Sequence, residues 1–395
     1  MKKNIFHFLS VGALFVLITS TLGACRKEAP DLERPEDYLG GNFEEVFESF
    51  WNGMNNNYVF WDQDTTDWDR VYRHYKPLFA EMNLNDTADI RKSYTYFKEM
   101  TQGLSDGHYT LQFNSALLAD SGAIQPSAAR NSKRENARQH IPLEYFYSGI
   151  PTLYLDSGYK KTGILDPGFR TITAVTGTIE QDIAYLSFNS FNLKSSYTNE
   201  AFKSVLDDFF NRVKADVPPR GVIIDLRGNG GGALADLDFL LGGFITEPLH
   251  FGYTKSKMDN NRLDYSQWIP AKINPTKDSK KVDIPFVVIV DQHSVSMSEI
   301  TATAVQAFPK GGVVGERTWG GQGPLIANFV YNGGQYRTSF MNLVYTSSMQ
   351  FVPLDKVSRE GFGFTPNREV NVTFEELASR NDTQLAAAVE MVKSK

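Results

Sequence analysis

The run Ile284-Pro285-Phe286-Val287-Val288-Ile289-Val290-Asp291 is followed closely by Ser294-Val295-Ser296-Met297-Ser298-Glu299-Ile300. The first run is apolar and typical of a buried strand, and a helical pattern begins at Ile300. Ser296 is therefore expected at a strand-to-helix turn, where its hydroxyl is exposed and faces the positive end of the helix. Two interpretations follow. Ser296 could be a nucleophile, or a plain N-cap that forms a capping box with Glu299.

The composition is that of an ordinary globular protein. The chain has 395 residues, 41% of them apolar and 22% charged, which is enough for two or three domains and a large core. The formal net charge is -6. A nucleic-acid-binding protein normally carries a basic excess, so we expect no nucleic-acid partner.

The N-terminus is typical of an export signal. Lys2 and Lys3 precede an apolar stretch at 5–18. The closing Leu22-Gly23-Ala24-Cys25 resembles a bacterial lipobox, which implies a signal peptide at 1–24 and acylation of Cys25, the only cysteine. The alternative is an uncleaved anchor with an incidental cysteine.

Residues 25–39 are charged, contain prolines and are predicted to be a tether. The expected location is the cell envelope, with a lipid anchor as the membrane contact. Arg26 after the lipidated cysteine favours the outer membrane, facing the periplasm.

Two regions precede the predicted core. Residues 40–115 are expected to form a mostly helical domain, because aromatic and aliphatic residues recur there at helical spacing. Residues 116–178 are expected to be β-rich, with a short strand at 141–146 among others. This segment leaves little room for a PDZ domain and has no Gly-Leu-Gly-Phe-like loop, so no complete PDZ domain is expected.

Strand and helix patterns alternate in residues 179–395. The apolar run at 221–226 follows a helical pattern at 202–213, and a second apolar run at 285–290 precedes another helix. This alternation predicts an α/β core with parallel strand pairing.

A glycine-rich motif, Asp225-Leu226-Arg227-Gly228-Asn229-Gly230-Gly231-Gly232, follows one of these buried strands. Consecutive glycines let the backbone approach a ligand closely, and their N–H groups can form an anion-binding nest. The motif could be an oxyanion hole, a phosphate loop or a tight turn. The phosphate loop is disfavoured, because no Gly-Lys-Ser/Thr follows and the glycine spacing is not the dinucleotide fingerprint.

Two further loops carry an ionisable residue. Ser105-Asp106-Gly107-His108-Tyr109-Thr110 contains His108, and Glu360-Gly361-Phe362-Gly363-Phe364-Thr365-Pro366-Asn367 places Glu360 among glycines. Taken alone, each is more typical of structure than of catalysis.

Together, and in this order, the four segments resemble the C-terminal processing and tricorn-core serine peptidases. Residues 225–232 are similar to that family's Asp-Leu-Arg-x-Asn-x-Gly-Gly. Residues 294–299 are similar to its Ser-Ala-Ser-Ala-Ser-Glu, whose middle serine, the nucleophile, falls on Ser296. The resemblance covers most of residues 104–370. It implies a ClpP/crotonase-like α/β core with an N-terminal helical domain and a β-rich insertion.

The family has two branches that differ in the general base. One uses a lysine in a Thr-Phe-Gly-Lys-Gly segment, and the matching stretch here places Gly321 where that lysine would be. The nearest lysine, Lys310, does not match. The tricorn branch uses an upstream histidine and a glutamate in Glu-x-x-Gly-Val-x-Pro, which match His108 and Glu360.

The resemblance therefore implies a Ser296-His108-Glu360 site without a metal or cofactor. Tricorn-type sites have a serine directly before the histidine, but this chain has Gly107. The link from Glu360 to His108 could therefore be direct, through water, or taken over by Asp106.

The same resemblance assigns the oxyanion hole to the N–H groups of Gly231 and Met297, with Gly230 and Gly232 beside them. Asp225, Arg227 and Asn229 are expected to scaffold the loop. His293 is nearer to Ser296 in sequence than His108 is, but reach matters more than sequence proximity for a base.

The expected function is that of a serine-type endopeptidase that hydrolyses peptide bonds in envelope proteins or peptides. One alternative is a non-catalytic ligand- or peptide-binding lipoprotein on the same fold. Another is a small-molecule esterase or amidase, because the same triad serves that chemistry. The oligomeric state stays open.

Overall fold

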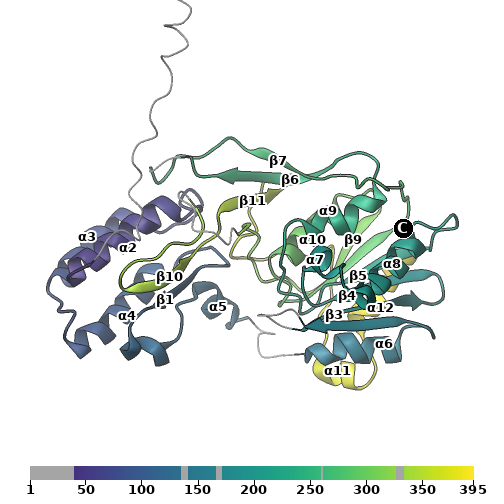
Figure 1. Cartoon of the computed structure of the whole chain (residues 1–395), viewed down its shortest axis with the longest axis horizontal. Helices are drawn as coiled ribbons and strands as arrows, with labels where there is room; N and C mark the ends of the chain where they lie inside the picture. The colour runs from purple at the N-terminus through teal and green to yellow at the C-terminus, as the bar shows by residue number, and fades with distance from the viewer. Residues whose placement is uncertain (1–39, 135–140, 166–170, 259–260, 326–332) are drawn as a thin grey trace, which may run out of the picture.

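The computed structural model describes residues 40–134, 141–165, 171–258, 261–325 and 333–395. The predicted signal peptide, the lipidation site and the tether lie outside these residues. A helical part lies at one end of the molecule and a layered α/β part at the other, with a long sheet passing above both (Figure 1). No helix in the described ranges has the length and apolarity that a membrane span requires.

The N-terminal part is helical, as the sequence predicts. Its aromatic core includes Phe50, whose ring lies 6.0 Å from that of Trp68 and 5.0 Å from that of Phe97. A two-stranded antiparallel sheet packs against the helices and pairs Thr110 with Tyr345. The elements are α2 (Phe43–Asn57), α3 (Trp68–Ala80), α4 (Thr87–Thr101), β1 (Thr110–Phe113) and β10 (Met341–Tyr345).

A seven-stranded mixed sheet forms the centre of the α/β part, in the order β12-β9-β8-β5-β4-β3-β2. The strands from β4 to β12 pair in parallel, and β2 and β3 add an antiparallel edge. This confirms the predicted α/β core with parallel pairing. The strands are β2 (Lys160–Leu165), β3 (Thr171–Ile179), β4 (Ile183–Phe188), β5 (Gly221–Asp225), β8 (Phe286–Val290), β9 (Gly311–Gly315) and β12 (Arg368–Glu369).

Helices cover both faces of this sheet, which explains its continuously apolar strands. In β8, Phe286 and Val288 face one core while Val287 and Ile289 face the other. The first face is covered by α7 (Leu193–Ser196), α8 (Glu200–Val213), α9 (Asp236–Leu241), η4 (Gly242–Phe244) and α10 (Met297–Gln306). The second is covered by η3 (Tyr145–Gly149), α6 (Ile150–Leu153), α11 (Phe374–Ala378) and α12 (Thr383–Ser394).

A separate antiparallel sheet reaches from the α/β part toward the helical part (Figure 1). Its order is β11-β6-β7, from β6 (Leu249–Ser256), β7 (Ile269–Ile273) and β11 (Met349–Pro353). The sequence analysis did not predict this sheet.

The segment 116–178 differs from the β-rich prediction. It begins with η2 (Ala116–Ser121) and α5 (Pro126–Asn131), and its strands β2 and β3 belong to the central sheet. The predicted strand at 141–146 is wrong, because this stretch leads into the π-helix η3 and helix α6. Its buried residues Phe146 and Ile150 lie four positions apart, a helical spacing that a short apolar run does not reveal.

Candidate active site

Ser296 lies at the turn between β8 and α10, as the sequence predicts. Its backbone has φ 58° and ψ −116°, a combination that non-glycine residues rarely adopt. An ordinary N-cap residue has extended backbone angles. The strained conformation therefore favours the nucleophile interpretation over a plain cap, since such strain concentrates at functional sites.

Glu299, one turn into α10, connects this turn to a second loop. Its Oε2 accepts the N–H of Ser296 at 3.1 Å and the N–H of Gly321 at 2.8 Å, and its Oε1 accepts the N–H of Gly320 at 2.9 Å. The Thr318 hydroxyl also donates to it. Burial raises the pKa of Glu299, although these donors oppose the shift. Glu299 therefore caps the helix and also fixes the loop at 318–321.

The glycine-rich loop packs directly on the Ser296 turn. The backbone oxygen of Asn229 accepts the N–H of Val295 at 3.1 Å and the Ser298 hydroxyl at 2.8 Å. The Asn229 side chain accepts the N–H of Gly231 at 2.8 Å. Asn229 thus positions the loop relative to the Ser296 turn, a role that the sequence left as general scaffolding.

Gly231 packs tightly against the Ser296 turn and the helix N-terminus. A Cβ on this residue would lie 2.7 Å from Ser296 Cβ, 2.8 Å from the backbone oxygen of Val295 and 2.9 Å from the backbone nitrogen of Met297, so only glycine fits here without a shift. Met297 is the first residue of α10, so the helix itself cannot satisfy its N–H. Gly231, Ser296 and Met297 all line one cavity, which therefore adjoins both the serine side chain and a backbone donor.

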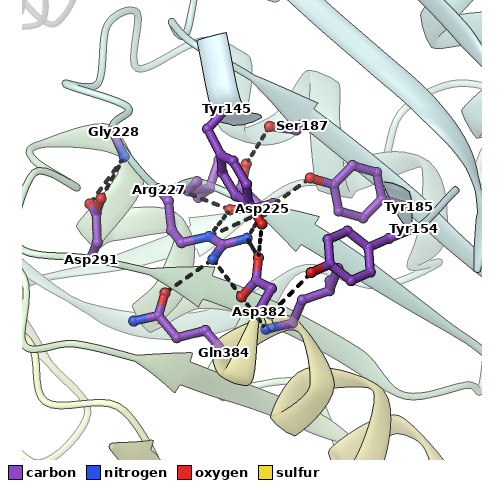
Figure 2. Close-up of polar contacts among 12 residues, drawn as sticks. Tyr145, Tyr154, Tyr185, Ser187, Asp225, Arg227, Gly228, Asp291, Asp382 and Gln384 are labelled. Atoms are coloured by element: carbon purple, nitrogen blue, oxygen red, sulfur yellow. Dashed lines mark hydrogen bonds and ion pairs between the residues drawn. The ribbon is translucent and has the colours of Figure 1, made fainter. Parts of the chain in front are cut away.

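A buried ion-pair network holds the strand that leads to this loop (Figure 2). Arg227 Nη2 lies 2.6 Å from Asp225 Oδ2, and its Nη1 donates to Asp382 at 3.0 Å and to Gln384 at 3.1 Å. The Tyr185 hydroxyl donates to Asp225 at 3.0 Å. The two ion-paired aspartates and the arginine link β5 to the start of α12, which agrees with a scaffolding role.

His108 lies in the loop between α4 and β1, which extends from the helical part to the α/β part. Asp106 Oδ1 accepts the N–H of His108 at 2.8 Å, and Asp106 also accepts the N–H and hydroxyl of Ser347. Glu360 Oε1 accepts the N–H of Gly107 at 2.7 Å. Both carboxylates therefore hold the backbone around His108.

The imidazole itself makes no hydrogen bond to either carboxylate among the described residues, and its buried Nδ1 has no partner there. One nitrogen of the ring nevertheless lies within 4.8 Å of oxygens of Asp106 and Glu360. Burial lowers the pKa of His108 to about 4, so the ring is neutral at physiological pH.

Burial also raises the pKa of the neighbouring carboxyls, Asp106 to about 6 and Glu360 well above its usual value. The negative charge of Asp106 adds to the shift of Glu360. Glu360 Oε2 accepts the N–H groups of Gln322 and Gly323 at 2.8 and 2.9 Å, which joins its loop to the 318–323 loop. Asp106, His108 and Glu360 are close enough to hold a metal ion, but the carboxylate oxygens already accept protein hydrogen bonds.

A cavity of about 380 Å³ brings most of the predicted site together. Glu360 and Asp106 lie behind His108 rather than on this wall, and Glu360 faces a different cavity. Tyr345 also lines the cavity, and no sequence signal pointed to it. The predicted residues on the wall are His108, Gly230, Gly231, Gly232, Ser296 and Met297.

Lys310 and His293, the two side chains that the sequence disfavours as the base, lie outside the cavity that contains Ser296. Lys310 follows the far end of α10 and pairs with Asp283 at 3.1 Å. His293 faces the far side of His108 rather than the cavity that contains Ser296.

Residues around α5 hold the His108 loop, and the sequence analysis did not identify them. Arg130 donates to the backbone oxygens of Leu104, Ser105 and Gly361. Arg134 donates to backbone oxygens in the 318–323 loop. These contacts depend on tertiary structure, so no local pattern could reveal them.

Comparison with known proteins identifies a peptidase family for part of the chain. Residues 182–370 match the model of peptidase family S41, and residues 41–94 match the tricorn protease C1 domain. The chain contains an S41 peptidase domain. That domain includes Ser296 and Glu360 but begins after His108. The carboxy-terminal-processing protease of Bartonella bacilliformis is 26% identical over 197 residues, which cover 50% of this chain and 40% of that protein.

Two solved structures resemble this chain over nearly its whole described length. A putative peptidase from Parabacteroides merdae has 23% identity and a TM-score of 0.63, covering 89% of this chain and 97% of the other. Mature CPAF has 11% identity and a TM-score of 0.61, covering 90% and 98%. These similarities establish a common fold: a mixed α/β core with an N-terminal helical region.

Proposed function

We propose that this chain is a serine-type endopeptidase in which Ser296 attacks the carbonyl carbon of a peptide bond. This proposal rests on the strained Ser296 turn, which lines the same cavity as His108 and the glycine loop. The cavity lined by Gly231, Ser296 and Met297 would receive the carbonyl oxygen next to the Met297 N–H. A donor at that place stabilises the oxyanion of the tetrahedral intermediate.

His108 is the proposed base. Its neutral imidazole takes the proton of Ser296 as the hydroxyl oxygen bonds to the carbonyl carbon. It then gives that proton to the amine nitrogen as the carbon–nitrogen bond breaks. Water hydrolyses the resulting ester of Ser296, with His108 again accepting a proton.

The second oxyanion donor comes from the glycine loop. For Gly231 to serve, its N–H must be shared between the Asn229 side chain and the substrate. Gly230 and Gly232 flank it on the same wall.

Glu360 and Asp106 are the proposed positioning residues. They hold the backbone of Gly107 and His108, and their oxygens lie close enough to receive the ring N–H after a small movement. Catalytic hydrogen bonds are often long without substrate and shorten when substrate binds. Envelope proteins or peptides are the proposed substrates.

A fluorophosphonate probe tests the site, because it labels only an activated serine. We expect one adduct on Ser296, located by mass spectrometry, that His108→Ala abolishes and Lys310→Ala retains. Cleavage of unfolded protein but not of small esters would distinguish the peptidase from an esterase or amidase. A wild-type protein that takes no probe and cleaves no peptide would overturn the proposal in favour of a binding protein.

We further propose that Cys25 carries a lipid that anchors the exported protein in the outer membrane, facing the periplasm. The lipobox-like sequence supports this. Cys25→Ser should move the protein from the membrane fraction to the soluble periplasmic fraction. Retention in the membrane would contradict the anchor.

A further inference from the structure

Two more cavities continue from the cavity beside Ser296. The next one, of about 380 Å³, shares His108, Gly230, Val295 and Tyr345 with it. A third, of about 650 Å³, shares Gln125 and Ala128 with the second and lies between α4 and α5. The shared residues place the three cavities in succession from Ser296 past His108 to the helical part, and we refer to this succession as the groove.

The far end of this groove is basic. Lys98, Arg130 and Lys133 line the third cavity, and no aspartate or glutamate is among the described residues that line it. The chain as a whole carries a net charge of -6, so this concentration of positive charge is local.

None of these three charges is neutralised by an ion pair within the described part of the chain. Lys98 and Lys133 are exposed to solvent. The Arg130 donors reach backbone oxygens of Leu104, Ser105 and Gly361, which occupy three of its five N–H groups but do not neutralise its charge. A carboxylate that enters the cavity therefore meets three uncompensated cations.

The proposed mechanism determines which part of the substrate lies in the groove beyond His108. His108 protonates the leaving amine, so the chain downstream of the cleaved bond must leave on the side of His108. The second and third cavities extend on that side.

We propose that the groove beyond His108 binds the downstream part of the substrate, and that Lys98, Arg130 and Lys133 select peptides with carboxylates there. This rests on the proposed function. A single terminal carboxylate would leave two of the three cations unmatched, so acidic side chains fit this cavity better. The α-carboxylate is the other possible source of the same chemistry.

Internally quenched peptides with one upstream sequence test the inference. Their downstream segments carry Glu, Gln or Lys, each with a free or amidated C-terminus. We expect a higher kcat/KM for Glu than for Gln, mostly through KM, and a smaller preference at high salt. A preference for the free C-terminus over the amidated one, with equal cleavage of the Glu and Gln peptides, would show that the cations recognise the α-carboxylate rather than acidic side chains.

Lys98→Gln and Lys133→Gln should each reduce the Glu preference about two- to fivefold, as removal of one partly exposed charge does. The matched control is Lys92→Gln, an exposed lysine on α4 that does not line the cavity. A Lys98→Glu/Lys133→Glu protein should prefer the Lys peptide. Equal cleavage of all peptides by the wild type would overturn the inference and leave the peptidase proposal intact.

A binding measurement tests the basic subsite independently of peptidase activity. A Ser296→Ala protein should bind a fluorescent Glu peptide more tightly than its Gln counterpart, measured by anisotropy. Selective binding without any cleavage by the wild type would refute the peptidase and keep the basic subsite. Unselective binding would refute the subsite.

Discussion

A side chain at position 321 would point at the imidazole of His108. A Cβ built on Gly321 lies 3.2 Å from Cε1 of His108 and 3.5 Å from Nδ1. Gly321 stands where the C-terminal processing branch is expected to have its lysine. The histidine of this chain therefore occupies space that the side chain of residue 321 would otherwise enter.

This relationship predicts that a lysine at position 321 can take over the proposed role of His108 as the base. His108→Ala should lower kcat/KM by about 10²–10⁴, the usual contribution of a general base. Adding Gly321→Lys to His108→Ala should restore part of the loss, because the new amine enters the vacated space. Gly321→Lys alone should lower activity, since it displaces the imidazole. A double variant no more active than His108→Ala would contradict the shared location.

Gly231→Ala should reduce kcat by about 10²–10³, because its Cβ would lie 2.7 Å from Ser296 Cβ and 2.9 Å from the Met297 nitrogen and would displace the proposed oxyanion donors. The φ of +91° adds about 1–2 kcal/mol of strain. Steady-state kinetics and thermal unfolding measure the two effects. Gly230→Ala is the comparison, because its Cβ would meet nothing within 4 Å, and it should cost much less. Equal losses would argue against this location for the oxyanion.

Arg227→Met should destabilise the fold by about 3–5 kcal/mol, because it leaves buried carboxylates without their partner. Urea unfolding measures this. The control is Arg368→Met, which breaks an exposed pair with Glu390 and should cost about 0–1 kcal/mol. A small effect at Arg227 would show that the network does not hold β5 to α12.

The pH profile should reflect the buried imidazole. His108 acts as a base only when neutral, and its folded pKa is about 4. The acid limb of kcat/KM should therefore lie near pH 4, well below the value near 6.5 of an exposed histidine. An acid limb at pH 6.5 or above would contradict the lowered pKa of the buried His108 imidazole.

The same shift makes stability depend on pH. The unfolded chain binds the His108 proton at about 6.5 and the folded chain at about 4, so this residue destabilises the fold as pH falls through that window. His108→Gln should remove this contribution, and the difference in Tm between variant and wild type should grow in the variant's favour from pH 7 to pH 4.

The central α/β core and the motifs could be read from the sequence because they depend on local pattern. The apolar runs at 221–226 and 285–290 are long enough to predict buried strands, and Ser296 sits at the boundary between two such patterns. The third sheet could not be predicted in the same way. Its strands β6 and β7 are partly exposed, and β6 also pairs with β11 from a distant part of the sequence.

The supports of the site also depend on tertiary contacts. Gly107 departs from the tricorn pattern, and the structure gives a steric reason. A Cβ there would lie 2.1 Å from the backbone oxygen of Gly320, so a serine does not fit this arrangement. Glu299 could be predicted as a helix cap, but its bonds to Gly320 and Gly321 required knowledge of where the 318–321 loop lies.

The hydrogen bond from Gly107 to Glu360 joins residues that are 253 positions apart. While the polypeptide is being synthesised, the histidine loop leaves the ribosome long before the glutamate that holds it. At about 5–20 residues per second, that interval lasts on the order of 10–50 seconds. A growing chain therefore contains Ser296 and His108 before it contains the glutamate that holds the histidine loop. The order of translation alone leaves the proposed site incomplete until most of the protein has been made.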